Sequence, residues 1–416
     1  MTFKFGWLDY SKEDSALIDS ALRELEKKTI EQLGFSSVRN NFRALLFPGA
    51  ANPMTRLRYN YFTAYIASNL EYLAKHFNNK SAESVQTQAE KKIRNILIKN
   101  RNEYGIFGLL NENRVPHQTY WGNLYVYGLV DRSEFPYSWI YFKEVDQKWK
   151  RNLYTHKDEG EHITESSFRF TLEKLSKSMT AVVERLTRGV KSSENEDIIN
   201  FKLTSEETKH FEETICKNFP DSLLNILIKD RKSLLSGNNP VMLEDYSGLM
   251  WHGIEERYLL GKDCNSLTED LKINLCYTFI FQRLMGVAYN YYNAMLFEQF
   301  ENDDVLSDID LLRSETLEAL NKYPYKPEEL FTFMVIHKWG SKQGELFLND
   351  IYEGLKKGKD HGYFKKIVIE REMKAKTPAL AKLHLNKYES GEYIKVSFGY
   401  DLNIRMVRRY LLDMGA

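Results

Sequence analysis

Four arginines, Arg39, Arg43, Arg56 and Arg58, stand close together in the sequence and could bind a phosphate or a carboxylate. The first two lie in a segment with apolar residues at helical spacing, which ends at a Phe-Pro-Gly break. The other two begin a segment, 56–66, that is apolar or aromatic nearly throughout. Because such a segment is expected to be a buried helix, its guanidinium groups must be paired or presented at a site.

Two interpretations of these arginines are open. The favoured one is internal pairing with Asp9, Glu31 or Glu71, because an arginine on a mainly buried helix is usually paired. The other is a binding site of Arg39, Arg56 and Arg58, for which guanidinium groups favour phosphate or carboxylate over metal.

The C-terminal part of the chain carries the clearest excess of positive charge. Between residues 356 and 416 there are 14 Lys or Arg against 7 Asp or Glu. Such a stretch could bind nucleic-acid phosphates. The candidate residues are Arg405, Arg408, Arg409, Lys365, Lys366 and Lys376. The alternatives are a solvated basic face, or a face that docks on the acidic segment 301–310.

One short pattern would suit a ribonuclease. Arg151 and His156 match the loose spacing of helical ribonucleases of the HEPN type, in which the histidine moves a proton and the arginine holds the scissile phosphate. These two residues are the weak catalytic candidates of the chain. A random pair of surface residues is the favoured interpretation, because so short a pattern arises easily by chance.

Two other patterns would suit metal chemistry. Asp221 with Asp230-Arg231-Lys232 mimics a restriction-endonuclease pattern, but Asp221 is better explained as the cap of a helix. The segment 156–162, with two histidines and three carboxylates, is better explained as a polar loop than as a metal site. No phosphate-binding glycine loop or dinucleotide fingerprint is present. We therefore expect no metal and no cofactor.

The segment from Pro116 to Val130 could be a recognition helix of a winged-helix element near residues 100–145. Its exposed positions would then be His117, Gln118, Asn123 and Arg114. The segment carries almost no positive charge. An ordinary amphipathic helix packed by its aromatic residues is therefore favoured.

The composition indicates a soluble globular protein. The 416 residues are 43% hydrophobic and 28% charged with zero formal net charge, and the longest apolar stretch, 276–297, contains Gln282 and Arg283, as a core helix would. Three cysteines without metal-ligand spacing favour a reducing cytosol, and the N-terminus lacks the pattern of a signal peptide. We expect a cytoplasmic location without a membrane span. The 26 Tyr and 24 Phe indicate many half-exposed positions at interfaces.

Helical periodicities dominate, so the predicted fold is mainly α, multi-helical, with a few short strands. A strand is expected over 393–400, where apolar and polar residues alternate. The expected regions are an N-terminal helical domain (1–190), a central helical domain (201–300) and a C-terminal basic α+β region (311–416).

The chain resembles a bacterial family of unknown function. The resemblance is carried by Phe5-Gly6-Trp7-Leu8-Asp9-Tyr10, by Arg39 with Phe42, by Leu45-Leu46-Phe47-Pro48-Gly49 and by Thr55-Arg56-Leu57-Arg58-Tyr59. Later blocks are Pro116 with Tyr120-Trp121, and Gly286 with 289–296. The chain departs from the family pattern at Gly122, which separates Trp121 from Asn123.

The family resembles accessory proteins of phage-defence clusters, whose genes accompany helicases and phospholipase-D-like nucleases. The resemblance implies, by association, a DNA-linked defence accessory. We therefore expect a non-enzymatic scaffold that binds a helicase or nuclease partner, with nucleic acid as a second ligand. The alternative is a nuclease that uses Arg151 and His156.

Overall fold

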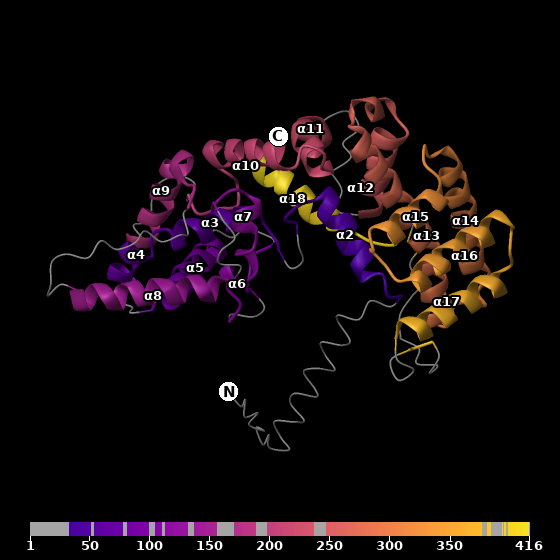
Figure 1. Cartoon of the computed structure of the whole chain (residues 1–416), viewed down its shortest axis with the longest axis horizontal. Coiled ribbons are helices and arrows are strands. Elements are labelled where there is room, and N and C mark those ends of the chain that lie inside the picture. Colours follow the sequence, from indigo (N-terminus) through magenta and orange to yellow (C-terminus); the bar gives the residue numbers. More distant parts are fainter. Residues whose placement is uncertain are drawn as a thin grey trace, which may run out of the picture. The chain divides into compact units, whose positions relative to one another are not determined.

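The chain is mainly α, as its sequence predicts. A computed structural model describes residues 33–50, 54–77, 81–99, 105–109, 113–131, 137–155, 170–188, 198–236, 247–376, 381–383, 393, 395–396 and 398–415 (Figure 1). These residues form seventeen α-helices, and their only strand-like pairing is the isolated antiparallel bridge between Val130 and Phe170. No helix among them is both long and apolar enough to cross a membrane.

The described residues fall into two compact units. Unit 1 contains those of 1–41 and 279–400, and unit 2 contains those of 42–278 and 401–416. Two of the three divisions fall within helices α2 (Ser36–Leu46) and α13 (Glu269–Leu296), and the third lies between Tyr400 and Asp401. Unit 1 also has α14 (Asp303–Lys322), α15 (Pro327–Ile336), α16 (Lys342–Lys356) and α17 (His361–Ala375).

Unit 2 holds the remaining helices. Before residue 200 these are α3 (Arg58–Ala67), α4 (Leu70–Phe77), α5 (Ala82–Lys99), α6 (His117–Tyr120), α7 (Asn123–Val126), α8 (Ser138–Thr155), the 3-10 turn η1 (Glu173–Leu175) and α9 (Ser176–Thr187). After it come α10 (Ser205–Asn218), α11 (Leu223–Ser236), α12 (Ser247–Ile254), the π-helix η2 (Glu255–Leu259), the 3-10 turn η3 (Lys262–Ser266) and α18 (Ile404–Met414).

Helix α3 is the centre of unit 2, and every one of its ten residues is buried. It packs against α5, α6, α7 and α9. The centre of the Tyr59 ring lies 5.3 to 6.2 Å from the ring centres of Phe107, Tyr120 and Phe201. The Tyr59 hydroxyl accepts a hydrogen bond from the Phe107 amide at 2.9 Å. The prediction of a buried helix over 56–66 is confirmed from Arg58 onward, whereas Arg56 is half-buried and precedes the helix.

The last helix, α18, belongs to unit 2, where it packs against α11 and α12 (Figure 1). The Trp251 indole of α12 donates a hydrogen bond to the Asp401 carbonyl at 3.0 Å. Asn403 adopts a left-handed conformation, with φ 65°, and its side-chain amide donates to the Ala50 carbonyl at 2.8 Å. The final residues thus complete the core of unit 2. The units therefore cut across the expected regions 1–190, 201–300 and 311–416.

The described residues of 393–400 form no strand, so that prediction is wrong. Amide side chains of α13 instead make hydrogen bonds with the backbones of Val396 and Tyr400. Asn290 donates to the Val396 carbonyl at 2.7 Å and accepts from the Val396 amide at 3.2 Å. Gln282 makes the same pair of bonds with Tyr400, at 2.7 and 2.6 Å. An extended segment needs partners for its backbone groups, and here a helix provides them.

Candidate functional site

Arg58 is paired inside unit 2. Its side chain is 1% exposed, and its Nε lies 2.9 Å from a carboxylate oxygen of Glu207 on α10. Its Nη1 donates to the carbonyls of Ile198 and Asn200, both at 2.9 Å. This guanidinium therefore joins α3 to α10 and to the segment before α10.

Glu207, the partner of Arg58, is fully buried and has further donors. It receives hydrogen bonds from the Thr204 amide at 2.8 Å, as part of the capping box of α10, and from the Tyr65 hydroxyl at 3.0 Å. Burial, reinforced by the Glu207 charge, raises the pKa of the Tyr65 hydroxyl, which keeps its proton as a donor. A carboxylate with these donors is well stabilised in an apolar interior.

Arg56, which lies just before the same helix, is also paired. Its Nη2 lies 3.3 Å from a carboxylate oxygen of Asp413 in α18, and its guanidinium carbon lies 4.3 Å from the centre of the Phe201 ring. Asp413 also accepts from the Leu57 amide at 3.3 Å. The Tyr120 hydroxyl accepts from the Thr55 amide at 2.6 Å. The motif Thr55-Arg56-Leu57-Arg58-Tyr59 thus fastens α18, α10 and α6 to α3.

The favoured interpretation of internal pairing is confirmed for Arg56 and Arg58, with different partners. Asp413 and Glu207 pair with them in place of the expected Glu71, and the other two expected carboxylates, Asp9 and Glu31, lie outside the described residues. Arg39 belongs to unit 1, where its guanidinium carbon lies 5.6 Å from the centre of the Tyr400 ring.

A buried histidine beside this network gives unit 2 a dependence on pH. The Tyr61 hydroxyl donates to the Glu207 carbonyl at 3.0 Å and lies 3.3 Å from Nδ1 of His210. Burial lowers the pKa of the His210 imidazole below its ordinary 6.5. Below pH 6.5 the unfolded chain therefore binds more protons at this position than the folded chain does.

We expect the free energy of unfolding to fall as the pH drops below 6.5, by up to about 1.4 kcal/mol per pH unit from His210 alone, until the folded histidine also takes its proton. The measurement is the urea midpoint at pH 7.5 and 5.5 for the native chain and for His210→Gln. The variant should lose less stability over this interval. Equal losses in the two proteins would assign the pH dependence to other groups.

The six basic-tail candidates divide between the two units. Arg405, Arg408 and Arg409 belong to unit 2, whereas Lys365, Lys366 and Lys376 belong to unit 1. The Arg405 side chain is 52% exposed and lies 3.3 Å from Asp401, and Arg408 and Arg409 are half-buried. Lys376 is only 3% exposed and lies 2.9 Å from the buried Glu372, so it cannot reach a phosphate.

The other two lysines of the tail have carboxylate neighbours in unit 1. Lys366 lies 4.0 Å from Glu370, and Lys365 lies 3.8 Å from Glu301. The acidic segment 301–310 also has Asp308 at 3.7 Å from Lys395 and Asp310 at 3.3 Å from His361. Three basic side chains of the tail, Lys365, Lys395 and His361, thus lie beside carboxylates of the acidic segment, as the docking alternative expects.

The nuclease-like patterns divide between described and undescribed residues. His156 and the cluster 156–162 lie outside the described residues, and Arg151 is described only as part of α8. Asp230 lies on helix α11, where it accepts from the Tyr258 hydroxyl at 2.7 Å. The helix cap is Ser222, whose hydroxyl accepts from the Asn225 amide at 3.2 Å, so the assignment of the cap to Asp221 is wrong.

The helix expected from Pro116 onward is two short helices, α6 and α7, interrupted at Trp121 and Gly122. Two of its four expected exposed residues are buried. His117 donates its backbone amide to the buried Glu90 at 3.0 Å and places Nδ1 2.8 Å from the same carboxylate. Asn123 donates to the Gly49 carbonyl. Only Gln118 and Arg114 face solvent, so His117 and Asn123 are not at the exposed positions that the winged-helix alternative gives them.

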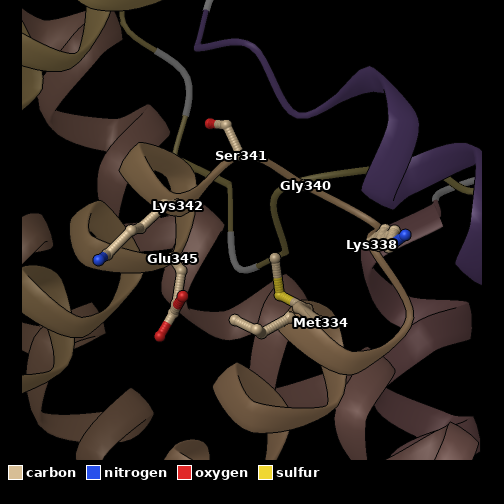
Figure 2. A pocket seen from close by; sticks show the side chains of 7 residues that line it. Met334, Lys338, Gly340, Ser341, Lys342 and Glu345 are labelled. Atoms are coloured by element: carbon tan, nitrogen blue, oxygen red, sulfur yellow. The ribbon is translucent and has the colours of Figure 1, made fainter.

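An open groove in unit 1 is a surface feature that the sequence did not indicate. It has a volume of about 420 Å³ and lies where α15 ends and α16 begins (Figure 2). Its lining residues are Met334, Val335, Lys338, Gly340, Ser341, Lys342 and Glu345. Val335 is 53% exposed, and the neighbouring Ile336 is 68% exposed. The run 327–336 is apolar on most sides, so its sequence does not show which apolar residues stay uncovered.

The turn that closes this groove holds a lysine in a strained conformation. Lys338 has φ 53°, and the Trp339 amide donates to the Met334 carbonyl at 3.0 Å, which is the hydrogen bond of a Schellman motif. The Trp339 ring packs on Phe333, with the ring centres 4.9 Å apart. A left-handed conformation at this position favours glycine over any residue with a Cβ.

We therefore expect Lys338→Gly to raise the free energy of unfolding of unit 1 by about 1 kcal/mol, whereas Lys338→Ala should not raise it. Both variants remove the same charge, so their difference isolates the backbone effect. The check is the urea midpoint of each variant. A glycine variant no more stable than the alanine variant would show that the turn carries no strain.

Among the described residues no group of three or more His, Cys, Asp or Glu side chains is placed to hold a metal ion. The three cysteines, Cys216, Cys264 and Cys276, form no disulfide. Comparison of the chain with protein families, with curated proteins and with solved structures gave no match.

Proposed function

We propose that this chain is a non-catalytic, helical scaffold of a bacterial anti-phage defence or nucleic-acid-processing complex, and that it binds a protein partner. The observation that carries the proposal is the exposed apolar surface where α15 meets α16, with Val335 and Ile336 more than half exposed beside a groove. Apolar side chains gathered around a hollow on a soluble protein mark a surface for a partner.

The arginine motif supports the same proposal. The motif has the residue types of an anion site, but in unit 2 its Arg56 and Arg58 are occupied by Asp413 and Glu207. Because these two arginines hold the helices of unit 2 together, we expect a partner to bind at an exposed surface instead. The resemblance to defence-cluster accessories suggests a helicase or a phospholipase-D-like nuclease as the partner, with DNA as a second ligand, in the cytoplasm.

The proposal is tested with the affinity-tagged full chain, purified from its native host and analysed by quantitative mass spectrometry. We expect one protein to co-purify in stoichiometric amount. In parallel, the purified chain is incubated with labelled RNA and DNA. Absence of any stoichiometric partner would overturn the proposal. Cleavage of RNA without added metal that is lost in His156→Ala would overturn it in favour of a nuclease.

A further inference from the structure

The groove between α15 and α16 combines an apolar floor with positively charged walls, and its chemistry indicates what it binds. Met334 is buried at its base, and Val335 lines it from the end of α15. Figure 2 shows Lys338 on one side and Lys342 on the other, with Met334 between them. The inference drawn from this groove rests on the proposed function as a partner-binding scaffold.

The charges at the groove are unbalanced. Lys338 and Lys342 are exposed, and the ammonium group of neither pairs with a carboxylate among the residues that the structure describes. The first turn of α16 adds the partial positive charge of a helix N-terminus, capped by the Ser341 hydroxyl, which accepts from the Gly344 amide at 3.1 Å. Glu345, half-buried, is the one carboxylate among the lining residues. This surface therefore complements carboxylates.

The groove is built on tightly packed backbone, so it is formed before a partner arrives. A Cβ added at Gly340 would lie 3.3 Å from Met334 and from Val38, and one added at Gly344 would lie 3.2 Å from Phe35. These glycines let the turn and α16 approach the start of α2 within unit 1. A rigid, pre-formed groove loses little conformational entropy on binding.

We propose that this groove binds an amphipathic helix of a protein partner, whose apolar face enters the groove and whose flanking carboxylates pair with Lys338 and Lys342. Helix-in-groove recognition uses apolar anchors at positions i, i+3, i+4 and i+7. An open groove of about 420 Å³ suits a few such anchors better than it suits an enclosed small molecule. Carboxylates beside those anchors give the orientation and the preference over basic helices.

The test uses two synthetic amphipathic peptides with identical leucine faces, one flanked by glutamates and its twin flanked by lysines. Binding to the full-length chain is measured by fluorescence anisotropy. We expect the acidic peptide to bind about tenfold or more tightly than its twin, and to weaken as salt is added. Lys338→Glu with Lys342→Glu should reverse the preference. Equal binding of the twins to the native chain would overturn the proposal.

A matched pair of variants tests the apolar floor. Val335 and Leu311 of α14 are each 53% exposed in unit 1, but only Val335 lines the groove. Val335→Glu should reduce binding of the acidic peptide about tenfold or more, whereas Leu311→Glu should leave it unchanged. Equal effects of the two variants would overturn the assignment to this groove.

Three further outcomes would also contradict the inference. Peptide binding that occurs only after removal of residues 1–32 would assign the groove to the chain's own N-terminal segment. A dimer dissociated by Val335→Glu would assign it to a second copy. A host partner that co-purifies equally well with the Val335→Glu variant would contradict the inference about the groove, but not the proposed scaffold function. If no partner co-purifies with the native chain, the proposed scaffold function itself is wrong.

Discussion

A chain that ends at residue 400 is expected to lose the fold of unit 2. The segment removed contributes buried apolar side chains to that unit: Leu402, Ile404, Met406, Val407, Tyr410, Leu411 and Met414. Each is worth about 1.5–3 kcal/mol when fully buried, so together they contribute about 10–20 kcal/mol, which is at least as large as the whole stability of most domains, about 5–15 kcal/mol. Loss of Asp401 and Asp413 also removes one hydrogen-bond acceptor of Trp251 and one carboxylate partner of Arg56.

Hydrogen exchange followed by mass spectrometry measures this effect directly, because the amides of α3 lie in the core of unit 2. We expect their protection to disappear in the truncated chain. The control is Arg405→Gln in the full chain, which removes an exposed charge of α18 and should leave the protection of α3 unchanged. Retained protection of α3 in the truncated chain would show that the C-terminal helix is an appendage, as a nucleic-acid-binding tail would be.

Replacing Arg58 by methionine is expected to lower the free energy of unfolding by about 3–5 kcal/mol, because it leaves the Glu207 carboxylate buried without its cation. It also removes donors from the carbonyls of Ile198 and Asn200. Arg58→Lys should recover part of this loss, since an ammonium keeps the charge but lacks the planar fork.

The measurement is urea unfolding followed by circular dichroism, and the matched control is Arg405→Met in the same unit. Arg405 is 52% exposed and lies 3.3 Å from Asp401, so its loss should cost less than about 1 kcal/mol. Similar midpoints for the Arg58 and Arg405 variants would mean that the internal pair does not hold unit 2 together.

The buried character of α3 could be predicted from the sequence, because a helix that is apolar all round has no face for water. The need to pair Arg56 and Arg58 followed from the same observation. Their partners could not be predicted, because Glu207 and Asp413 lie far along the chain in other helices. Local sequence patterns carry no information about such distant contacts.

The C-terminal segments show the same limit. The amphipathic pattern of 404–411 predicted a helix with an apolar face and an arginine face, but not that unit 2 would bury its apolar face. The alternation over 393–400 predicted a strand, but amide groups of Gln282 and Asn290 on α13 make hydrogen bonds with the backbones of Tyr400 and Val396. Alternation alone does not distinguish a neighbouring strand from a neighbouring helix as the partner of an extended backbone.

We propose separate roles for two features: the arginine motif holds the helices of unit 2 together, and the groove binds the partner. Two variants separate these roles experimentally. Arg58→Met with Glu207→Gln removes both charges of the internal pair together. The amide oxygen of the introduced glutamine can still accept the hydrogen bond from the Thr204 amide, and its NH2 group can donate to the Tyr65 hydroxyl oxygen. Val335→Glu places a charge in the groove and leaves the internal pair untouched.

The most direct test is the amount of host partner that co-purifies with each tagged variant, normalised to folded protein. The account predicts that Val335→Glu loses the partner, whereas the folded fraction of the Arg58→Met, Glu207→Gln variant retains it. Loss of the partner from the folded double variant, with full retention by Val335→Glu, would contradict the account. It would indicate that the arginine motif is the binding site.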